Sequence, residues 1–418
     1  MAYIVVKLGG SVCEGPSSAP ALARIVSSYR EPAVFVLSAL KGVTDRILAF
    51  SSSDSGKSAE AARALAQSLK LQYGAFAAAF SPEAAALSSI EEGLAILADE
   101  FVAAALSEKG DSFARLASYG ERFSALAFSA ALVPALANDL SGHGVADDGT
   151  SRGGRSGLPV AFPEDLGLGA QLKEGAHDDA SCEDPAAAWP ALERELARWG
   201  RLAVPGFYGM LPDGGVALYG RGGTDYSAVA LAAAGGARSC DLYKDSAALR
   251  SADPAFVDGT RAVPRLSYGE ASDLSASGAR VLHPRTAGLA ERHGITLRIV
   301  SLAGEQGSVV CANISGKARA RPKAIALGHP YGEAARTGPG QGPRDEELRA
   351  LSIVGEGIAL ASIYAVQAMK ALEGQGIPAR SIHFDPSGRK LAFLVPEAQG
   401  VLALRALHAA FFGAGRVS

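Results

Sequence analysis

Two glycine-rich turns, each with a cation, are the parts of this sequence best suited to chemistry. They are Lys7–Ser11 (KLGGS) and Gly220–Asp225 (GRGGTD). Because glycine has no Cβ, the backbone N–H groups of such turns approach phosphate oxygens closely, and a helix that begins at the turn adds a favourable dipole. Neither turn matches the GxxxxGK[ST] or GxGxxG nucleotide motifs. The alternative is two tight turns without a ligand. Two turns together, with Lys7 and Arg221 inside them, favour an anion-binding site.

The elements that must position these turns alternate between strand and helix. Residues 3–8 and 33–37 are short apolar runs of the length and β-branched content typical of buried parallel strands. Residues 58–106 are rich in Ala, Leu, Glu and Lys, and a helical pattern continues through Glu121. This alternation predicts an α/β protein with a mainly parallel sheet.

The second turn follows a predicted hairpin. Its strands flank Asp213–Gly215, a typical hairpin turn, and a helix follows the glycines. Upstream, residues 141–184 shift to Gly, Asp, Ser and Pro, so we expect a mobile excursion there, with the character of a lid over a nearby site. An Ala-, Leu- and Glu-rich helix is predicted directly after it.

The end of the chain has a different organisation. Residues 313–345 are dense in Gly, Pro, Arg and Lys and are typical of a linker. From Leu348 the pattern predicts strand, helix, strand, strand and helix, which suits a small α+β domain.

Composition limits the class of protein. The 418 residues carry 40 Lys and Arg against 43 Asp and Glu, a net charge of −3 that does not favour a nucleic-acid or anionic-membrane partner. No run of eighteen apolar residues suggests a membrane span, and the first residues lack the pattern of a signal peptide, so we expect a cytoplasmic protein. The four cysteines are far apart without CxxC spacing, which argues against disulfides and a zinc site.

Seven short motifs, taken in order, resemble those of the aspartate kinases of the amino-acid kinase family. They are KLGGS, LSALKGVTD, YGERFSA, GFYG, GRGGTDYSA, ADP and ARVLHPRT, and they span about residues 3–305. The resemblance implies an αβα sandwich over residues 1–305 that transfers the γ-phosphoryl group of ATP to the β-carboxylate of aspartate. It also implies a linker or remnant of a second regulatory module over 306–345, an ACT-like domain over 346–418, and a homodimer.

The resemblance gives roles to the substrate-side residues. Lys7 would stabilise charge on the transferred phosphoryl group, as phosphoryl transfer requires. Arg221 would bind the α-carboxylate in a bidentate pair. Glu121 and Asp225 would bind the ammonium, and Asp225 would also orient Lys7. Hydroxyls and a ring beside the substrate are implied for Ser38, Thr44 and Phe207, although each alone is more often a cap or core residue.

The nucleotide side is implied to use the first turn and four later residues. Nucleotide contacts are expected from Gly9, Gly10, Ser11, Lys244, Asp245, Arg250 and Arg280. Mg²⁺ is expected with the ATP phosphates, Asp245 being a weak outer-shell candidate, and no protein metal site is predicted. His283 invites a general-base role, but a carboxylate is already deprotonated at pH 7, so a structural role is expected.

This sequence departs from the family on the nucleotide side. Lys244 stands where the family usually has Thr, Arg250 where it has Tyr, Ala255 where it has Arg, and Arg280 where it has Lys. One cation is lost and two are gained, so the positive field over the phosphates is expected to survive. Only one regulatory module fits after Gly304, which predicts weakened feedback inhibition by lysine or threonine.

Two alternatives remain open from the sequence. One keeps the chemistry and changes the acceptor to a related amino acid or small carboxylate. The other is a catalytically impaired homologue that binds nucleotide or amino acid and acts through a partner. The substrate-side residues are all retained, which favours an enzyme.

Overall fold

The computed structural model describes ten segments of the chain. They are residues 1–52, 58–107, 112–139, 158–173, 176–245, 248–279, 282–302, 307–312, 320–330 and 347–413. The chain forms two compact units: Met1–Asp245 with Val300–Glu305, and Ser246–Ile299 with Gln306–Ser418. Each unit is described by itself below.

A parallel sheet forms the centre of the first unit. Its strands are β1 (Ile4–Leu8), β2 (Ala33–Leu37), β5 (Arg201–Pro205) and β8 (Cys240–Lys244), in the order β5-β2-β1-β8. All three pairings are parallel. Apart from the half-buried Lys244, every residue of these strands is buried, which explains their continuous apolar sequence. The predicted parallel sheet is confirmed.

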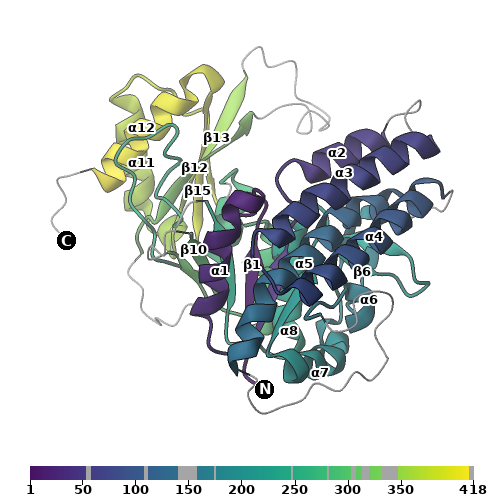
Figure 1. The fold of residues 1–418 in the computed structure, drawn as a ribbon. Coiled ribbons are helices and arrows are strands. Elements are labelled where there is room, and N and C mark those ends of the chain that lie inside the picture. Colours follow the sequence, from purple (N-terminus) through teal and green to yellow (C-terminus); the bar gives the residue numbers. More distant parts are fainter. Residues whose placement is uncertain are drawn as a thin grey trace. The chain divides into compact units, whose positions relative to one another are not determined.

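Helices cover both faces of this sheet (Figure 1). They are α1 (Ala19–Ser28), α5 (Ser112–Asp139), α7 (Trp189–Trp199) and α8 (Gly223–Ala234). Helices α2 (Val43–Ser51), α3 (Ala59–Ala78) and α4 (Ala84–Ala105) pack against α5. The ring of Phe35 in β2 lies 5.7 Å from that of Phe128 in α5. Its neighbour Val36 points the other way, toward Gly206 and the start of α8. Successive strand residues thus face opposite layers, and the αβα sandwich is confirmed.

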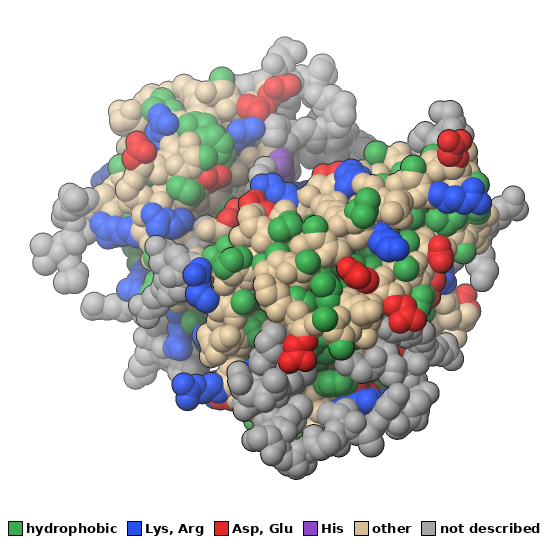
Figure 2. Space-filling view, in the orientation of Figure 1, with side chains coloured by type: hydrophobic (Ala, Val, Ile, Leu, Met, Phe, Trp, Pro, Cys, Tyr) green, Lys and Arg blue, Asp and Glu red, His purple; other side chains and the backbone are tan. Residues whose placement is uncertain are grey.

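The predicted hairpin around Asp213–Gly215 is also confirmed. Strands β6 (Tyr208–Met210) and β7 (Val216–Leu218) are antiparallel, and Asp213 Oδ1 accepts the N–H of Gly215 at 2.9 Å. Figure 2 shows the face of the unit over α3 and α4, where hydrophobic and small side chains alternate with scattered charges.

The segment 141–184 is more regular than the expected mobile excursion. Its described part holds α6 (Pro163–Leu166), β3 (Gln171–Lys173) and β4 (Ala176–Ser181), while residues 140–157 lie outside the described residues. The N–H of Ala170 donates to the carbonyl of Met210 at 2.8 Å, which fixes the segment to the β6–β7 hairpin. Gly and Asp clusters mark turns, but they do not reveal short strands that depend on a distant partner.

Three further strands have the order β10-β11-β9 and belong to the same seven-stranded sheet as β5-β2-β1-β8. They are β10 (Leu297–Ser301), β11 (Val309–Val310) and β9 (Arg265–Leu266). The second unit also contains an antiparallel sheet with the order β12-β13-β15-β14, from β12 (Ala324–Pro330), β13 (Leu348–Val354), β15 (Lys390–Pro396) and β14 (Ser381–Phe384).

Four α-helices complete the described part of the second unit. They are α9 (Tyr268–Ala276), α10 (Pro284–His293), α11 (Ser362–Glu373) and α12 (Gly400–Phe412). Helices α11 and α12 share a buried apolar cluster with the antiparallel sheet, including Leu351, Phe393 and Leu404. The order of elements after Leu348 is therefore the predicted one. Short 3₁₀ helices in the two units lie at Pro16–Ser18, Pro185–Ala188, Ile358–Leu360 and Glu397–Gln399.

Strand β12 lies inside the segment predicted to be a linker. It pairs with β13, and Ile325 opposite Ile353 is buried in the same cluster. Its apolar run is short and flanked by Pro and Gly, so the composition of 313–345 hid it. Residues 246–299 group with the second unit rather than with the first. The domain boundaries at 305 and 345 stay predictions.

Two further features concern the cysteines and the apolar helices. All four cysteines are free and buried. Among the described residues, no helix is long and apolar enough to cross a membrane.

Candidate functional site

A cavity of about 610 Å³ lies in the first unit where β1, β2 and β7 end and α8 begins. Eight of the predicted site residues line it: Lys7, Gly10, Ser38, Thr44, Glu121, Phe207, Arg221 and Asp225. Ligands of open α/β sheets bind at the carboxyl ends of the strands, and this cavity has that position. The two glycine-rich turns thus open onto one cavity.

Lys7 and Asp225 form a buried ion pair at the base of this cavity. Lys7 Nζ lies 2.8 Å from Oδ1 of Asp225, and Lys244 Nζ lies 3.2 Å from Oδ2 of the same carboxylate. Burial alone would raise the pKa of Asp225, but the charges of Lys7 and Lys244 hold it below its usual value. Asp225 is therefore ionised at neutral pH, and the two lysines around it give the cluster one net positive charge.

The side chain of Lys7 explains why position 9 is a glycine. A Cβ at Gly9 would lie 2.7 Å from Lys7 Nζ, closer than carbon and nitrogen can approach. The glycine thus leaves room for the ammonium to reach Asp225. Gly9 and Ser11 are not among the residues that line the cavity, whereas Gly10 is.

The second turn presents Arg221 at the start of α8. Gly220 and Gly222 have φ of 73° and 74°, a left-handed conformation that glycine adopts without strain. Helix α8 begins at Gly223, and its first turn is tied to the end of β2 because Ser38 Oγ donates to Thr224 Oγ1 at 3.0 Å. Arg221 is exposed, and its guanidinium is available to an anion that enters the cavity.

Glu121 is a buried carboxylate on the wall of the cavity, 3% exposed. Its Oε1 accepts the N–H of Ala39 at 3.2 Å, and its Oε2 has no hydrogen-bond partner in the described part of the chain. Burial raises the pKa of Glu121 to about 8, and the Ala39 N–H opposes that rise. A cationic ligand would satisfy the oxygen and restore the ionised form.

Phe207 is held in a strained backbone conformation beside the second turn. Its φ is 76°, which is rare for a bulky residue. The N–H of Phe207 donates to Ser227 Oγ at 2.8 Å, and its carbonyl accepts the N–H of Tyr219 at 2.8 Å. Strain fixed by neighbours in this way is typical of functional sites.

The remaining nucleotide-side predictions lie elsewhere. Lys244 reaches the cavity only through Asp225, and Asp245 is exposed directly after β8. Arg250 belongs to the second unit, where its guanidinium donates to Thr260 Oγ1 at 3.0 Å and to the Thr260 carbonyl at 2.8 Å. Arg280 lies outside the described residues.

His283 has the structural role expected for it. It is the N-cap of α10, and its Nδ1 accepts the N–H of Arg285 at 3.4 Å. A cap at the first turn of a helix accounts for the residue without chemistry.

Several residues of the cavity escaped sequence reasoning. The cavity is also lined by Lys41, Asp45, Phe113, Thr224 and Asp178. Lys41, Asp45 and Thr224 lie inside motifs already recognised, so the motifs could have identified them. No motif contains Phe113 or Asp178, because Phe113 lies at the start of a long helix and Asp178 lies in β4, within the segment 141–184.

Solved structures with this fold include aspartokinases. The chain aligns with E. coli aspartokinase III, in a complex with aspartate and ADP, at a TM-score of 0.70 and 20% identity, over 98% of this chain and 100% of that one. It aligns with Clostridium acetobutylicum aspartate kinase at a TM-score of 0.72 and 15% identity, over 98% and 100% of the two chains. At such identities the likeness establishes the fold.

Curated relatives share part of the sequence. The chain is 31% identical to an aspartokinase of Thermus thermophilus over 220 residues, 52% of this chain and 51% of the relative. It is 39% identical to aspartokinase 2 of Bacillus subtilis over 110 residues, 26% and 27% of the two chains. The chain thus spans about half the length, or less, of these curated relatives. The model of the amino acid kinase family matches residues 2–301, so the chain belongs to that family.

Proposed function

We propose that this protein transfers the γ-phosphoryl group of ATP to the β-carboxylate of L-aspartate, giving 4-phospho-L-aspartate and ADP. One observation carries the proposal: a single cavity holds the Lys7–Asp225 pair, the exposed Arg221 and the unpartnered Oε2 of Glu121. An amino acid needs an anion site and a cation site, and phosphoryl transfer needs a further cation. The sequence similarity to aspartokinases supports the same substrate.

The chain's own residues suffice to position an aspartate. Arg221 binds its α-carboxylate through two parallel hydrogen bonds, and Glu121 Oε2 accepts from its ammonium. The free β-carboxylate then faces Lys7. Thr44 and Ser38 supply hydroxyls at the cavity wall, and the ring of Phe207 closes one side.

The reaction needs no general base. A β-carboxylate oxygen, ionised at neutral pH, forms a bond to the γ-phosphorus while the bond from that phosphorus to the bridging oxygen of ADP breaks. Lys7 stabilises the charge on the transferred group, and Asp225 holds the Lys7 ammonium in place. Preorganised charge of this kind is the main source of catalysis in phosphoryl transfer.

We place the nucleotide phosphates over the first turn. The net positive charge of the Lys7–Asp225–Lys244 cluster supports this, and Gly9, Gly10, Ser11, Asp245, Arg250 and Arg280 stay proposed nucleotide contacts. The described residues contain no group of three His, Cys, Asp or Glu side chains suited to a metal. Mg²⁺ is proposed to bind through the phosphates and to neutralise them, with Asp245 as a candidate for an outer-shell contact.

Residues 346–418, within the second unit, are proposed to form an ACT-like regulatory module, and the protein is proposed to be a homodimer. The element order after Leu348 and the antiparallel sheet with two helices on one face support the module. Exposed apolar side chains follow one side of α11: Leu360, Ile363, Val366 and Met369, each at least 39% exposed. A second copy is the proposed partner of this stripe. The cytoplasmic location stays a prediction.

The decisive assay is ADP release with aspartate as acceptor. We expect turnover by the native protein and none above background by Lys7→Ala, while Lys173→Ala, an exposed lysine of β3, keeps native activity. An acceptor panel run in parallel separates aspartate from related amino acids and small dicarboxylates. Calorimetric binding of ATP without turnover of any acceptor would instead support the impaired homologue.

A further inference from the structure

Asp225 is poorly suited to bind the ammonium of a substrate. Each of its oxygens faces a lysine, Lys7 at 2.8 Å and Lys244 at 3.2 Å. Two ammonium groups around one carboxylate leave a net positive charge, which repels a further cation. The cluster therefore attracts the anionic parts of the reactants, and the ammonium must be held elsewhere.

Glu121 alone satisfies only part of an ammonium. A primary ammonium has three N–H donors. Glu121 offers Oε2, because Oε1 already accepts from Ala39 at 3.2 Å. A second acceptor on the cavity wall would complete the site and compensate the positive charge around Asp225.

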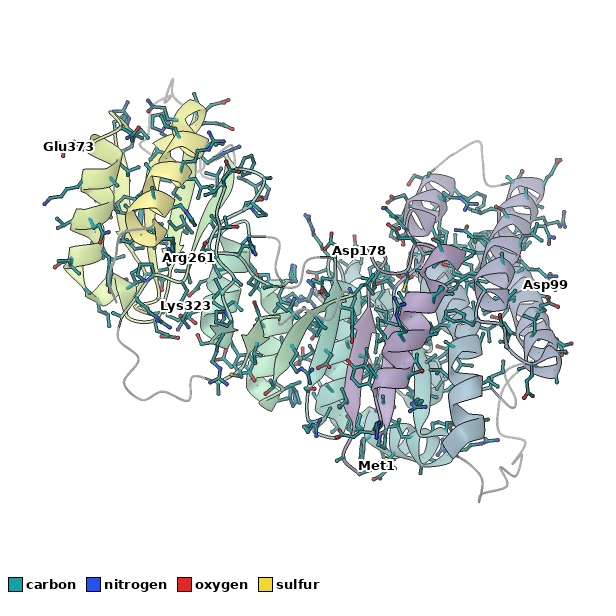
Figure 3. All side chains as sticks on the ribbon, turned by 60° about the vertical axis from the view of Figure 1, so that its left-hand side comes forward. Met1, Asp99, Asp178, Arg261, Lys323 and Glu373 are labelled. Atoms are coloured by element: carbon teal, nitrogen blue, oxygen red, sulfur yellow. The ribbon has the colours of Figure 1, made fainter. Side chains whose placement is uncertain are left out.

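Asp178 is a carboxylate on that wall. It lines the same cavity as Glu121 and Arg221, and its side chain is exposed. Within the described residues it has no hydrogen bond or ion pair. Figure 3 shows Asp178 at the end of the sheet opposite to Met1, which is the end where β1 delivers Lys7.

The position of Asp178 is fixed by its surroundings. The neighbouring His177 Nδ1 lies 3.3 Å from the carbonyl oxygen of Val216 in β7, the strand that leads into the Arg221 turn. The N–H of Cys182 donates to the hydroxyl of Tyr226 in α8 at 3.1 Å. The strand that carries Asp178 is thus anchored on two elements that also build the substrate side.

Asp45 is the rival carboxylate. It also lines the cavity, but it lies in the first turn of α2, where an acidic residue stabilises the positive end of the helix dipole. Its charge therefore has a structural explanation, whereas that of Asp178 has none.

We propose that Asp178 is a specificity-determining residue that binds the substrate ammonium together with Glu121. The inference rests on the proposed function, because it takes an amino acid as the acceptor. A negative charge at this wall attracts an acceptor with an ammonium and repels the same dicarboxylate without one. Asp178 thus selects aspartate over succinate.

The test compares Asp178→Asn with Asp179→Asn, which makes the same charge change one residue away, at a carboxylate that does not line the cavity. For Asp178→Asn we expect the KM for aspartate to rise about tenfold, as for loss of a hydrogen bond to a charged group, with kcat within about twofold. The kcat/KM for succinate should stay the same or rise. The effect on aspartate should shrink at high ionic strength, since Asp178 is exposed. Asp179→Asn should match the native protein.

Three results would overturn the inference. The first is that Asp178→Asn and Asp179→Asn have the same KM for aspartate. The second is that Asp178→Asn loses the same factor of kcat/KM for aspartate and for succinate. The third is that Asp45→Asn raises the KM for aspartate more than Asp178→Asn does. Calorimetry, which needs no turnover, gives a second readout. We expect Asp178→Asn to bind aspartate more weakly than the native protein and Asp179→Asn. If the native protein binds aspartate but turns over no acceptor, the proposed function fails while Asp178 remains testable by binding.

Discussion

The ammonium of Lys244 lies 3.2 Å from the carboxylate of Asp225, on the oxygen opposite to the one that meets Lys7. A lysine at a position where a threonine was expected has therefore joined the central ion pair. It makes the carboxylate more firmly ionised and adds positive charge toward the proposed phosphate site.

Replacing Lys244 tests how much it contributes to nucleotide binding. Lys244→Thr removes one of the two cations, so we expect the KM for ATP to rise several-fold while kcat changes less than in Lys7→Ala. Steady-state kinetics with ATP varied gives the comparison, and Lys173→Thr is the matched surface control. A kcat as low as that of Lys7→Ala would mean that Lys244 acts on the transferred group itself.

The buried Glu121 predicts a pH dependence. Its pKa of about 8 in the unliganded protein is above the ordinary value of 4.5, so its contribution to stability is present below pH 4.5 and is lost as pH rises through about 8. Glu121→Gln should therefore lose less thermal stability between pH 6 and pH 9 than the native protein. Scans of melting temperature across that range measure the difference. Identical pH slopes would contradict it.

Bound aspartate should lower the raised pKa of Glu121. An ammonium beside Glu121 favours the ionised carboxylate, so binding below about pH 8 should release a proton. Calorimetry in two buffers of different ionisation enthalpy detects that proton. Glu121→Gln should show neither the proton release nor native affinity.

The left-handed Phe207 predicts an inverted ranking of two small residues. At φ 76° alanine keeps the strain, whereas glycine relieves it by about 1 kcal/mol. Phe207→Gly should therefore be more stable than Phe207→Ala in urea unfolding, with both variants impaired in aspartate binding. The opposite order would show that the backbone at this position is relaxed.

Gly9 predicts a loss of activity without loss of fold. In Gly9→Ala the new Cβ would lie 2.7 Å from the present position of Lys7 Nζ, so the flexible ammonium must shift, which weakens its ion pair with Asp225. We expect kcat to fall up to about tenfold, as for weakening of one charged contact, with a normal circular dichroism spectrum. Gly74→Ala in α3, where a Cβ meets nothing within 4 Å, is the control and should be neutral or slightly stabilising.

The antiparallel sheet β12-β13-β15-β14 predicts weak feedback control. Only one βαββα arrangement follows β12 in the described chain, and paired modules are what the resemblance links to effector binding. We expect lysine or threonine at millimolar concentration to leave the rate unchanged. Clear inhibition of the purified enzyme by either amino acid would contradict this.

The parallel sheet and many of the residues that line the cavity were predictable from the sequence. Lys7 ends a continuous apolar strand and Arg221 stands in a turn before a helix, so local patterns placed both. Parallel strands bring their carboxyl ends to one edge, and for that reason the two turns meet. The αβα layers follow from strand residues such as Phe35 and Val36 that are apolar on both faces.

The remaining features depend on tertiary pairing. Strand β12 was hidden because four apolar residues between Pro and Gly look like a loop until β13 covers them. Asp178 was missed because its strand is defined by contacts with β7 and α8 rather than by periodicity. The sharing of Asp225 by two lysines was not visible either, since Lys244 is nineteen residues away along the chain.

The four buried thiols can be used to detect local opening of the structure. Burial raises the pKa of Cys13 to about 12, with the charge of Lys7 opposing, so the native thiol does not react with a thiolate-directed dye at neutral pH. The N–H of Cys13 donates to the carbonyl of Gly9 at 3.0 Å, which links this thiol to the turn that holds Lys7. The rate at which the dye labels Cys13 therefore measures how often that turn opens, and a bound reactant should lower this labelling rate.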